Sequence, residues 1–460
     1  MSPSARKIAS QIAPRIAFYG DDFTGATDAL GTATRAGLRT LLFLSLPDDE
    51  RMQRAGALDC VGIAGAARSM SPDEMRAELT PIARWFEKLG ASVLHYKCCS
   101  TFDSAPQVGS IGVAVEVLRS AVAQPWVAVV GGQPELRRYC VFGNLFAAAG
   151  HGGEVHRIDR HPTMSRHPVT PMHEADLRRH LALQGFDGLR SMAYPAYAQG
   201  AEAVHASAEA MVSEGASGVL FDVARQEDLA TLGEALSMRT AAGRLASHEP
   251  RDSMLVVGPS SVLQAFAPQM RAMPDAALNS TLNPTASPVT PAQGPVLVLA
   301  GSLSPVTAKQ VAAAASYEKV WLDPVALAGA EPAHLDAVAA RLSALLAAGH
   351  NVLACTASPA TAADASLSAR ALAHAGGALL ARVLAVTPVR RVGVAGGDTS
   401  SHAVQALDAW GLSYLATLSP GAPLCRVHSD DAALDGIELM LKGGQMGDED
   451  VFERLVYGTR

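Results

Sequence analysis

Residues 15–30, RIAFYGDDFTGATDAL, contain the features that decide the fold of this 460-residue chain. A short β-rich apolar run, RIAFYG (15–20), leads directly into two aspartates, and a helical pattern begins near Thr24. The same order of apolar run, polar loop and helical pattern follows in TLLFLS (40–45), VGIAG (61–65), ASVLHY (91–96) and WVAVVGG (126–132). This alternation predicts an α/β fold with a mainly parallel sheet flanked by crossover helices.

The chain is too long for one ordinary hydrophobic core, so its length favours two domains. Residues 271–295 are rich in Pro, Ser, Thr and Asn and lack a hydrophobic period, which is typical of an interdomain linker. We therefore predict one α/β domain over 1–270, a linker over 271–295 and a second α/β domain over 296–460, with a ligand cleft between the domains. Further strands are expected at 218–223 and 253–258 in the first domain, and at 296–302, 319–323, 351–356 and 391–397 in the second.

Composition excludes several classes of partner. The formal net charge is −7 and there is no long Lys/Arg run, so neither nucleic acid nor an anionic membrane surface is an expected partner. The N-terminus lacks an apolar signal-peptide core and no segment approaches the ~20 apolar residues of a membrane span. We expect a cytoplasmic protein.

Cysteine and histidine spacing argues against disulfides and bound metal. The six cysteines form no CxxC pair, which favours reduced thiols. His156, His161, His167 and His173 match no known ligand spacing, so no protein-held metal site is expected.

The two aspartates in DDFTG are the strongest local signal for chemistry. Open α/β sheets bind ligands beyond the carboxyl ends of their strands, which is where Asp21 and Asp22 are expected. Such carboxylates can accept hydrogen bonds from substrate hydroxyls, remove a proton from one, or hold Mg²⁺ through water. Asp22 has an alternative role as the N-cap of the following helix. Because one cap needs one aspartate, Asp21 is the stronger catalytic candidate.

A second polar loop follows the strand that ends in YKCCSTFDS (96–104). Lys97 could neutralise a substrate carboxylate while Ser100 and nearby N–H groups bind its oxygens, and Asp103 either binds substrate or fixes the loop. Arg68 follows another strand, and its guanidinium suits bidentate carboxylate recognition. The loop residues could instead be turn or cap residues, and Arg68 could be a solvated surface group. The prediction of a substrate site therefore depends on the positions of these residues directly after strands.

Three glycine-rich turns follow strands in the second half: LAGSLSPVT (299–307), VAGGDTSSHAV (394–404) and LMLKGGQMG (439–447). Such turns offer backbone N–H groups and helix N-termini to phosphate, so together they predict a nucleotide site. The chain contains no GxxxxGK[ST], no GxGxxG after a strand and no GxSxG. These absences argue against a P-loop ATPase, a Rossmann dehydrogenase and an α/β-hydrolase.

In their order and separation, six motifs of this chain resemble the four-carbon acid sugar kinase family almost end to end: DDFTGATDA, YKCCSTFDS, RHPVTPMHEADL, AGSLSPVT, AGGDTSSHAV and LKGGQMG. The resemblance implies an acid-sugar-binding N-terminal domain and a nucleotide-binding C-terminal domain. It also implies ATP-dependent phosphorylation of the terminal hydroxyl of a tetronate such as threonate, erythronate or 3-oxo-tetronate. The small acid sugar and ATP/ADP are the expected partners, with Mg²⁺ bridging the ATP phosphates.

Carried over by motif, the resemblance implies substrate contacts at Asp21, Arg68, Lys97, Cys98, Cys99 and Ser100. It implies nucleotide contacts at Ser302, Gly396, Gly397, Asp398, Thr399, and at Gly443 or Gly444. Asp398 could instead help to hold Mg²⁺.

The chain also departs from the family. KGGQMG (442–447) replaces a Lys-Ser-Gly-Asn-Phe-Gly-like loop, and Cys98-Cys99 replaces more varied residues. The stretches FGNLFA and MSRHPVTPM are similar to part of the family only, so a variant acid sugar stays open as the substrate.

Two other function classes compete with a kinase. A catalytically silent sensor would keep both ligand sites without transfer. A reductase or aldolase of sugar-acid catabolism could use the same acidic rim, although the dinucleotide fingerprint is absent. The sequence does not reveal the oligomeric state; a homodimer is possible, since it is the commonest assembly.

Overall fold

The computed structural model describes residues 14–122, 126–150, 152–167, 169–246, 253–270, 288–302, 304–356 and 369–459. Most of the expected linker, 271–287, lies outside these residues. The chain forms two compact units. The first comprises Met1–Asp21, Thr32–Leu41 and Leu46–Asn283, and the second comprises Asp22–Gly31, Leu42–Ser45 and Pro284–Arg460.

The sheet of the first unit is parallel throughout, as the alternating pattern predicts. Its strand order is β3 (Cys60–Ala64), β1 (Ile16–Gly20), β4 (Val93–Lys97), β11 (Met254–Gly258), β5 (Val127–Gln133), β10 (Gly218–Asp222) and β9 (Leu189–Met192). All of these strands except β9 consist entirely of buried residues. Burial on both faces explains why they read as continuous apolar runs rather than as alternating ones.

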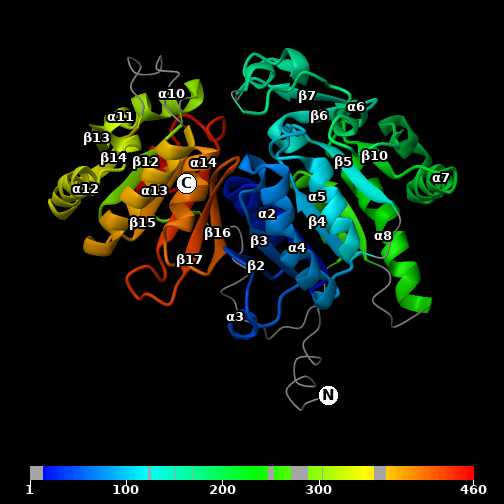
Figure 1. The fold of residues 1–460 in the computed structure, drawn as a ribbon, viewed down its shortest axis with the longest axis horizontal. Helices are drawn as coiled ribbons and strands as arrows, with labels where there is room; N and C mark the ends of the chain where they lie inside the picture. The colour runs from blue at the N-terminus through cyan, green and yellow to red at the C-terminus, as the bar shows by residue number, and fades with distance from the viewer. Residues whose placement is uncertain are drawn as a thin grey trace. The chain divides into compact units, whose positions relative to one another are not determined.

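Helices flank this sheet (blue to green in Figure 1). α4 packs on α5, and α7 packs on α8, which contacts α9. The helices of the N-terminal half are α2 (Phe23–Arg35), α3 (Asp49–Ala55), α4 (Pro72–Leu89), α5 (Ile111–Leu118), α6 (Leu177–Ala182), α7 (Ala201–Ser213), α8 (Asp228–Ala246) and α9 (Ser261–Phe266).

Local sequence accounts for the ends of these helices. Ser71 and Glu74 form a capping box at the start of α4, and Pro72 occupies its first position. The first N–H groups of a helix have no acceptor within it. The capping box supplies acceptors for such groups, and Pro72 has no N–H to satisfy. Gly90 ends α4 in the left-handed region at φ 69°, where glycine avoids the steric cost of a Cβ.

A small antiparallel sheet, which the sequence did not indicate, continues from the end of β5. β6 (Arg138–Val141), β7 (Asn144–Ala148) and β8 (Val155–Arg157) pair in series. The buried Asp222 carboxylate holds the β6–β7 turn by accepting hydrogen bonds from the N–H groups of Phe142 (2.6 Å) and Gly143 (2.9 Å). This support comes from a residue about 80 positions away, so the local pattern could not reveal it.

The second unit has a mixed sheet, whose strands run from green (β12, Val296–Ala300) to red in Figure 1, apart from β2 (Thr40–Phe43) in blue. Its parallel part has the order β13 (Tyr317–Trp321), β14 (Asn351–Cys355), β12, β15 (Arg391–Ala395) and β18 (Glu438–Lys442). The antiparallel strands β17 (Ala422–His428) and β16 (Gly411–Ser419) follow, and β16 pairs with Leu42 and Phe43 of β2.

The helices of this unit are α10 (Pro305–Ala313), α11 (Pro324–Ala328), α12 (Pro332–Ala347), α13 (Ala369–Val386), α14 (Gly397–Gln405) and α15 (Val451–Tyr457). Within the described residues, no helix combines the length and apolarity that a membrane crossing requires. The predicted fold class, two α/β domains with mainly parallel sheets, is confirmed.

Candidate functional site

Three of the predicted substrate loops meet at the backbone of Asp21 in the first unit. Asp21 follows β1, which lies between β3 and β4. Its N–H donates to the carbonyl of Lys97 (3.0 Å), and its carbonyl accepts from the N–H of Arg68 (3.0 Å). The carboxyl ends of three neighbouring strands therefore bring Asp21, Arg68 and Lys97 together, as the sequence predicts.

Asp22 has a defined structural role. Its carboxylate accepts hydrogen bonds from the Gly25 N–H (2.6 Å) and the Thr24 hydroxyl (2.9 Å). These are the contacts of an N-cap at the start of α2. The structural alternative for Asp22 is thus observed, and a role in catalysis stays a prediction.

The end of β4 carries one buried cation. The Lys97 ammonium donates to the carbonyl of Cys98 (2.9 Å). Burial lowers the pKa of the neighbouring His95 to about 3, and the Lys97 charge acts in the same direction. At neutral pH, His95 is therefore uncharged, and Lys97 is the basic residue at this strand end that can attract an anion.

The Cys98 side chain is a packed, protonated thiol. It is 1% exposed, and burial together with the Asp21 carboxylate raises its thiol pKa well above the usual value. The Cys98 N–H donates to the carbonyl of Gly258 (3.1 Å), while its own carbonyl accepts from Lys97. Cys98 thus supports the loop, and a direct substrate contact from it stays a prediction.

The loop after Cys98 is organised around Asp103. The Thr101 hydroxyl donates to the Asp103 carboxylate (2.6 Å) and lies 3.0 Å from the Cys99 thiol. Arg68 lies 4.0 Å from the same carboxylate. Although burial raises the pKa of Asp103, the charges of Arg68 and His167 and these hydrogen bonds hold it below the usual value. Asp103 therefore stays ionised near neutral pH. Ser100 is buried in the same loop.

A second layer of polar side chains fixes this loop from α6. The His180 ring lies 2.9 Å from the Ser104 hydroxyl and 3.1 Å from the carbonyl of Phe102. The Gln184 amide donates to the Ser104 hydroxyl (2.8 Å) and accepts from the Ile111 N–H (2.7 Å). The sequence did not indicate these residues, because their partners lie more than 70 positions away.

In the second unit, the three glycine-rich turns converge at Ser302. A Cβ on Gly444 would lie 2.3 Å from the Ser302 hydroxyl, and one on Gly396 would lie 3.3 Å from the Ser302 N. Gly396 also has φ 128°, a left-handed conformation that favours glycine. The left-handed φ and the nearby Ser302 backbone favour glycine at 396, whereas a Cβ at 444 would meet the Ser302 side chain. Ser302, Gly396 and Gly444 are thus brought together, as predicted.

The N-terminus of α14 opens at this convergence. Gly397, Asp398 and Thr399 form its first turn, and Gly396 precedes it without a side-chain cap. The first N–H groups of a helix have no acceptor within that helix and attract anions. Gly443 begins the third turn, directly after β18. The arrangement suits a phosphate chain.

Lys442 and Gln310 are two buried polar residues of this region that were not predicted as site residues. The Lys442 ammonium donates to the Thr307 hydroxyl (3.2 Å), and burial lowers its pKa to about 7. The side-chain nitrogen of Gln310, which carries two protons, lies within 3.0 Å of the carbonyl oxygens of residues 446–448. Lys442 stood within the quoted motif, whereas no local signal marked Gln310.

The described residues contain no cluster of three or more His, Cys, Asp or Glu side chains placed to hold a metal. Asp398 is exposed in the first turn of α14, where it could contact a metal carried by a phosphate ligand. Mg²⁺ is usually held by one or two carboxylates together with substrate phosphates, which fits this single acidic residue.

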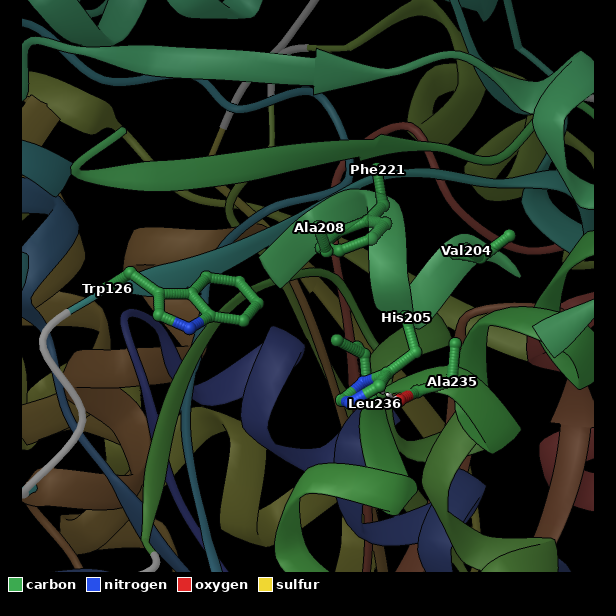
Figure 2. Close-up of a pocket in the computed structure, with 7 residues that line it drawn as sticks. All are labelled: Trp126, Val204, His205, Ala208, Phe221, Ala235 and Leu236. Carbon is green, nitrogen blue, oxygen red and sulfur yellow. Dashed lines mark hydrogen bonds between the residues drawn. The ribbon is translucent and has the colours of Figure 1, made fainter. Parts of the chain in front are cut away.

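A recess elsewhere in the first unit is too small for a sugar. It lies among α7, α8 and β10 and is lined by Trp126, Val204, His205, Ala208, Phe221, Ala235 and Leu236 (Figure 2). Its volume is about 10 Å³, which is room for one water molecule. The His205 ring lies 3.1 Å from the carbonyl of Ala235. We call Asp21, Arg68, Lys97 and Asp103, at the ends of β1, β3 and β4, the substrate cluster. None of them lines the recess.

Two family models match the two halves of the chain. The model of a sugar-binding N-terminal domain matches residues 16–266, and the model of a nucleotide-binding C-terminal domain matches residues 297–452.

Characterised relatives align over nearly the whole chain. The 3-oxo-isoapionate kinase of Paraburkholderia graminis is 39% identical over 95% of this chain and 93% of its own length. The 3-oxo-tetronate kinase of Cupriavidus necator is 33% identical over 96% of both chains. The fold and these relatives define a sugar acid kinase. The chain belongs to the four-carbon acid sugar kinase family.

Solved structures share the fold. A putative tRNA synthase from Salmonella typhimurium LT2 aligns with a TM-score of 0.74 at 24% identity, covering 96% of this chain and 98% of that chain. A Haemophilus influenzae protein aligns with a TM-score of 0.66 at 24% identity, covering 95% of this chain and 98% of that one. At this identity, the likeness concerns the fold alone.

Proposed function

We propose that this kinase transfers the γ-phosphoryl group of ATP to the terminal hydroxyl of a four-carbon or closely related 3-oxo acid sugar. One observation carries the proposal. Each unit gathers its motif residues at the carboxyl ends of neighbouring parallel strands, with Arg68, Lys97 and Asp21 in the first unit and the turns around Ser302 in the second. The charged side chains of the first set suit a ligand with a carboxylate and hydroxyls. The turns of the second set suit a triphosphate.

The substrate carboxylate binds to Arg68 and Lys97 in this proposal, with Cys98, Cys99 and Ser100 forming the loop around it. Arg68 is the more accessible of the two basic residues, because it is partly exposed whereas Lys97 is buried. Asp103 lies 4.0 Å from the Arg68 guanidinium and orients it by charge attraction.

Asp21 orients or deprotonates the attacking hydroxyl. Asp22 is the weaker candidate for this role, because its carboxylate already caps α2. Positioning and charge stabilisation supply most of the catalysis of phosphoryl transfer, so the remaining residues act by holding the reactants in line.

The triphosphate binds to the N–H groups of the turns that contain Ser302, Gly396, Gly397, Thr399, Gly443 and Gly444. Asp398 contacts Mg²⁺, which enters with ATP and supplies charge neutralisation on the phosphates. The sugar site thus belongs to the N-terminal domain and the nucleotide site to the C-terminal domain, in keeping with the descriptions of the matching family models.

We infer that 3-oxo-isoapionate is the first substrate to test. The relative named for it is 39% identical to this chain, against 33% for the 3-oxo-tetronate kinase of Cupriavidus necator. Residues 164–172 form one of the two stretches that resemble only part of the family. This stretch lies close enough to the substrate cluster for the charge of His167 to act on Asp103. 3-Oxo-tetronate, threonate and erythronate are the other candidates.

An ADP-release assay across these four acids tests the proposal. We expect release that requires both ATP and one acid, with a phosphorylated product of matching mass. Binding of both ligands without ADP release would instead support the sensor. Consumption of the acid without ATP would support the reductase or aldolase.

A further inference from the structure

The polar face of α10 holds the third glycine turn in place. Ser304 precedes the helix as its N-cap, and Thr307 and Gln310 follow at three-residue intervals, so that the three side chains share one face. All three donate hydrogen bonds to carbonyl groups of residues 443–448, which we call the glycine loop.

The first half of the glycine loop is fixed at Gly444. The hydroxyls of Ser304 and Thr307 both donate to its carbonyl, the latter at 3.0 Å. The Thr307 hydroxyl also accepts from the Lys442 ammonium (3.2 Å). Because a hydroxyl carries a single proton, this second contact directs the Thr307 proton to the Gly444 carbonyl.

The second half of the loop is fixed by Gln310. Its side-chain nitrogen lies 3.0 Å from the carbonyl oxygen of Met446, 2.9 Å from that of Gly447 and 3.0 Å from that of Asp448. Gln310 is fully buried, and within the described residues its amide oxygen has no hydrogen-bond partner. Leucine would fill similar space without burying an amide, so packing alone does not explain this residue.

These contacts orient the peptide units of the loop. In a planar trans peptide, the carbonyl and the following N–H point in opposite directions. With the Gly444 carbonyl held toward α10, the Gln445 N–H points away from α10. Among the described residues this N–H has no acceptor, and Gln445 is only partly buried. N–H groups displayed in this way form anion-binding concavities.

We propose that Gln310 is a positioning residue for the nucleotide. It holds the glycine loop against α10, together with Ser304 and Thr307, so that the loop presents its N–H groups to a phosphate of ATP. The inference rests on the proposed function and deepens it, because it assigns nucleotide affinity to a residue that does not touch the nucleotide.

The test is made on the full chain with Gln310→Leu. Titration calorimetry with MgADP measures Kd, and steady-state kinetics measure KM for ATP and for the acid sugar. We expect Kd for MgADP and KM for ATP to rise at least about tenfold, equivalent to about 1.4 kcal/mol. KM for the acid sugar stays within about twofold, because α10 belongs to the second unit.

Gln184→Leu is the matched control. Gln184 is also a buried glutamine that fixes a loop, but that loop belongs to the substrate cluster. We expect this variant to raise KM for the acid sugar and to leave Kd for MgADP unchanged. A general loss of stability would change Kd for MgADP and KM for the acid sugar in both variants. Positioning predicts that Gln310→Leu changes only the nucleotide constants and Gln184→Leu only KM for the acid sugar.

Thr307→Val and Thr307→Ser keep the inference testable if Gln310→Leu does not fold. Valine removes the hydroxyl and should weaken MgADP binding, while serine keeps it and should restore binding. Wild-type Kd for MgADP in folded Gln310→Leu, or in Thr307→Val, would overturn the inference but leave the proposed function intact. Failure of the wild-type chain to bind any adenine nucleotide would overturn both.

Discussion

The Arg68 guanidinium lies 4.0 Å from the Asp103 carboxylate, although the two residues follow different strands. Arg68 follows β3 and Asp103 follows β4, which are separated by β1 in the sheet. The pairing brings an accessible cation to the edge where the sugar carboxylate is proposed to bind.

Arg68→Gln should weaken binding of the acid sugar. A hydrogen bond to a charged group contributes about 1.5–3 kcal/mol, so KM should rise roughly 10- to 100-fold. The pKa of Asp103 should rise as well, because the Arg68 charge is the largest influence that lowers it. The acid limb of the kcat/KM profile should therefore move to higher pH.

Arg76→Gln is the control for this change. Arg76 lies on α4, where it pairs with Glu116 at the surface. Its removal should leave KM and the pH profile unchanged. An unchanged KM in Arg68→Gln would remove Arg68 from carboxylate recognition.

Asp21→Asn should reduce kcat by orders of magnitude, about 10²- to 10⁴-fold for a lost general base. Asp22→Ser should have a much smaller effect, because serine can still accept the N–H bond that caps α2. Steady-state kinetics with both variants separate the two aspartates. Near-normal turnover in Asp21→Asn would exclude Asp21 from the mechanism, and an equal loss in both variants would contradict the assignment of Asp22 to capping.

Lys442→Met should alter how stability depends on pH. Burial lowers the folded-state pKa of Lys442 to about 7 from an ordinary value of 10.5. Between these values the unfolded chain binds more protons, so this residue makes the free energy of unfolding rise with pH. Each unit of pKa corresponds to about 1.4 kcal/mol. The stability of Lys442→Met relative to wild type should therefore be greatest at pH 7 or below and should decline toward pH 10.

Urea unfolding of both chains at several pH values measures this difference. Lys319→Met is a suitable control, because Lys319 lies on β13 with a bond only to the carbonyl of Ala312 among the described residues. Its difference from wild type should not depend on pH over the same range. A pH-independent difference for Lys442→Met would show that its ammonium is not destabilised by burial.

The sequence revealed the parallel sheets and the sheet edges at which the candidate site lies. Buried parallel strands read as apolar runs, and a polar residue directly after such a run must lie at the carboxyl edge. That reasoning located Asp21, Arg68 and Lys97 in the first unit, and Ser302 and Gly396 in the second. It could not decide between capping and chemistry for Asp22, because the same carboxylate serves either purpose.

The residues that support the site could not be predicted in this way. Gln184 and Gln310 are buried polar residues that bond to backbone groups about 73 and 138 positions away in the chain. The strands β6 and β7 were not predicted for a related reason, because their turn is held in part by Asp222, about 80 positions away. Local patterns carry no information about such distant partners.

Phosphorus NMR of the wild-type chain with MgATP and 3-oxo-isoapionate, repeated with 3-oxo-tetronate, tests the central claim most directly. We predict that the γ-phosphate resonance of ATP is replaced by a phosphomonoester resonance in equal amount to the ADP formed, and only when an acid sugar is present. Formation of inorganic phosphate alone, or an unchanged ATP spectrum with every acid sugar tested, would contradict the proposed transfer.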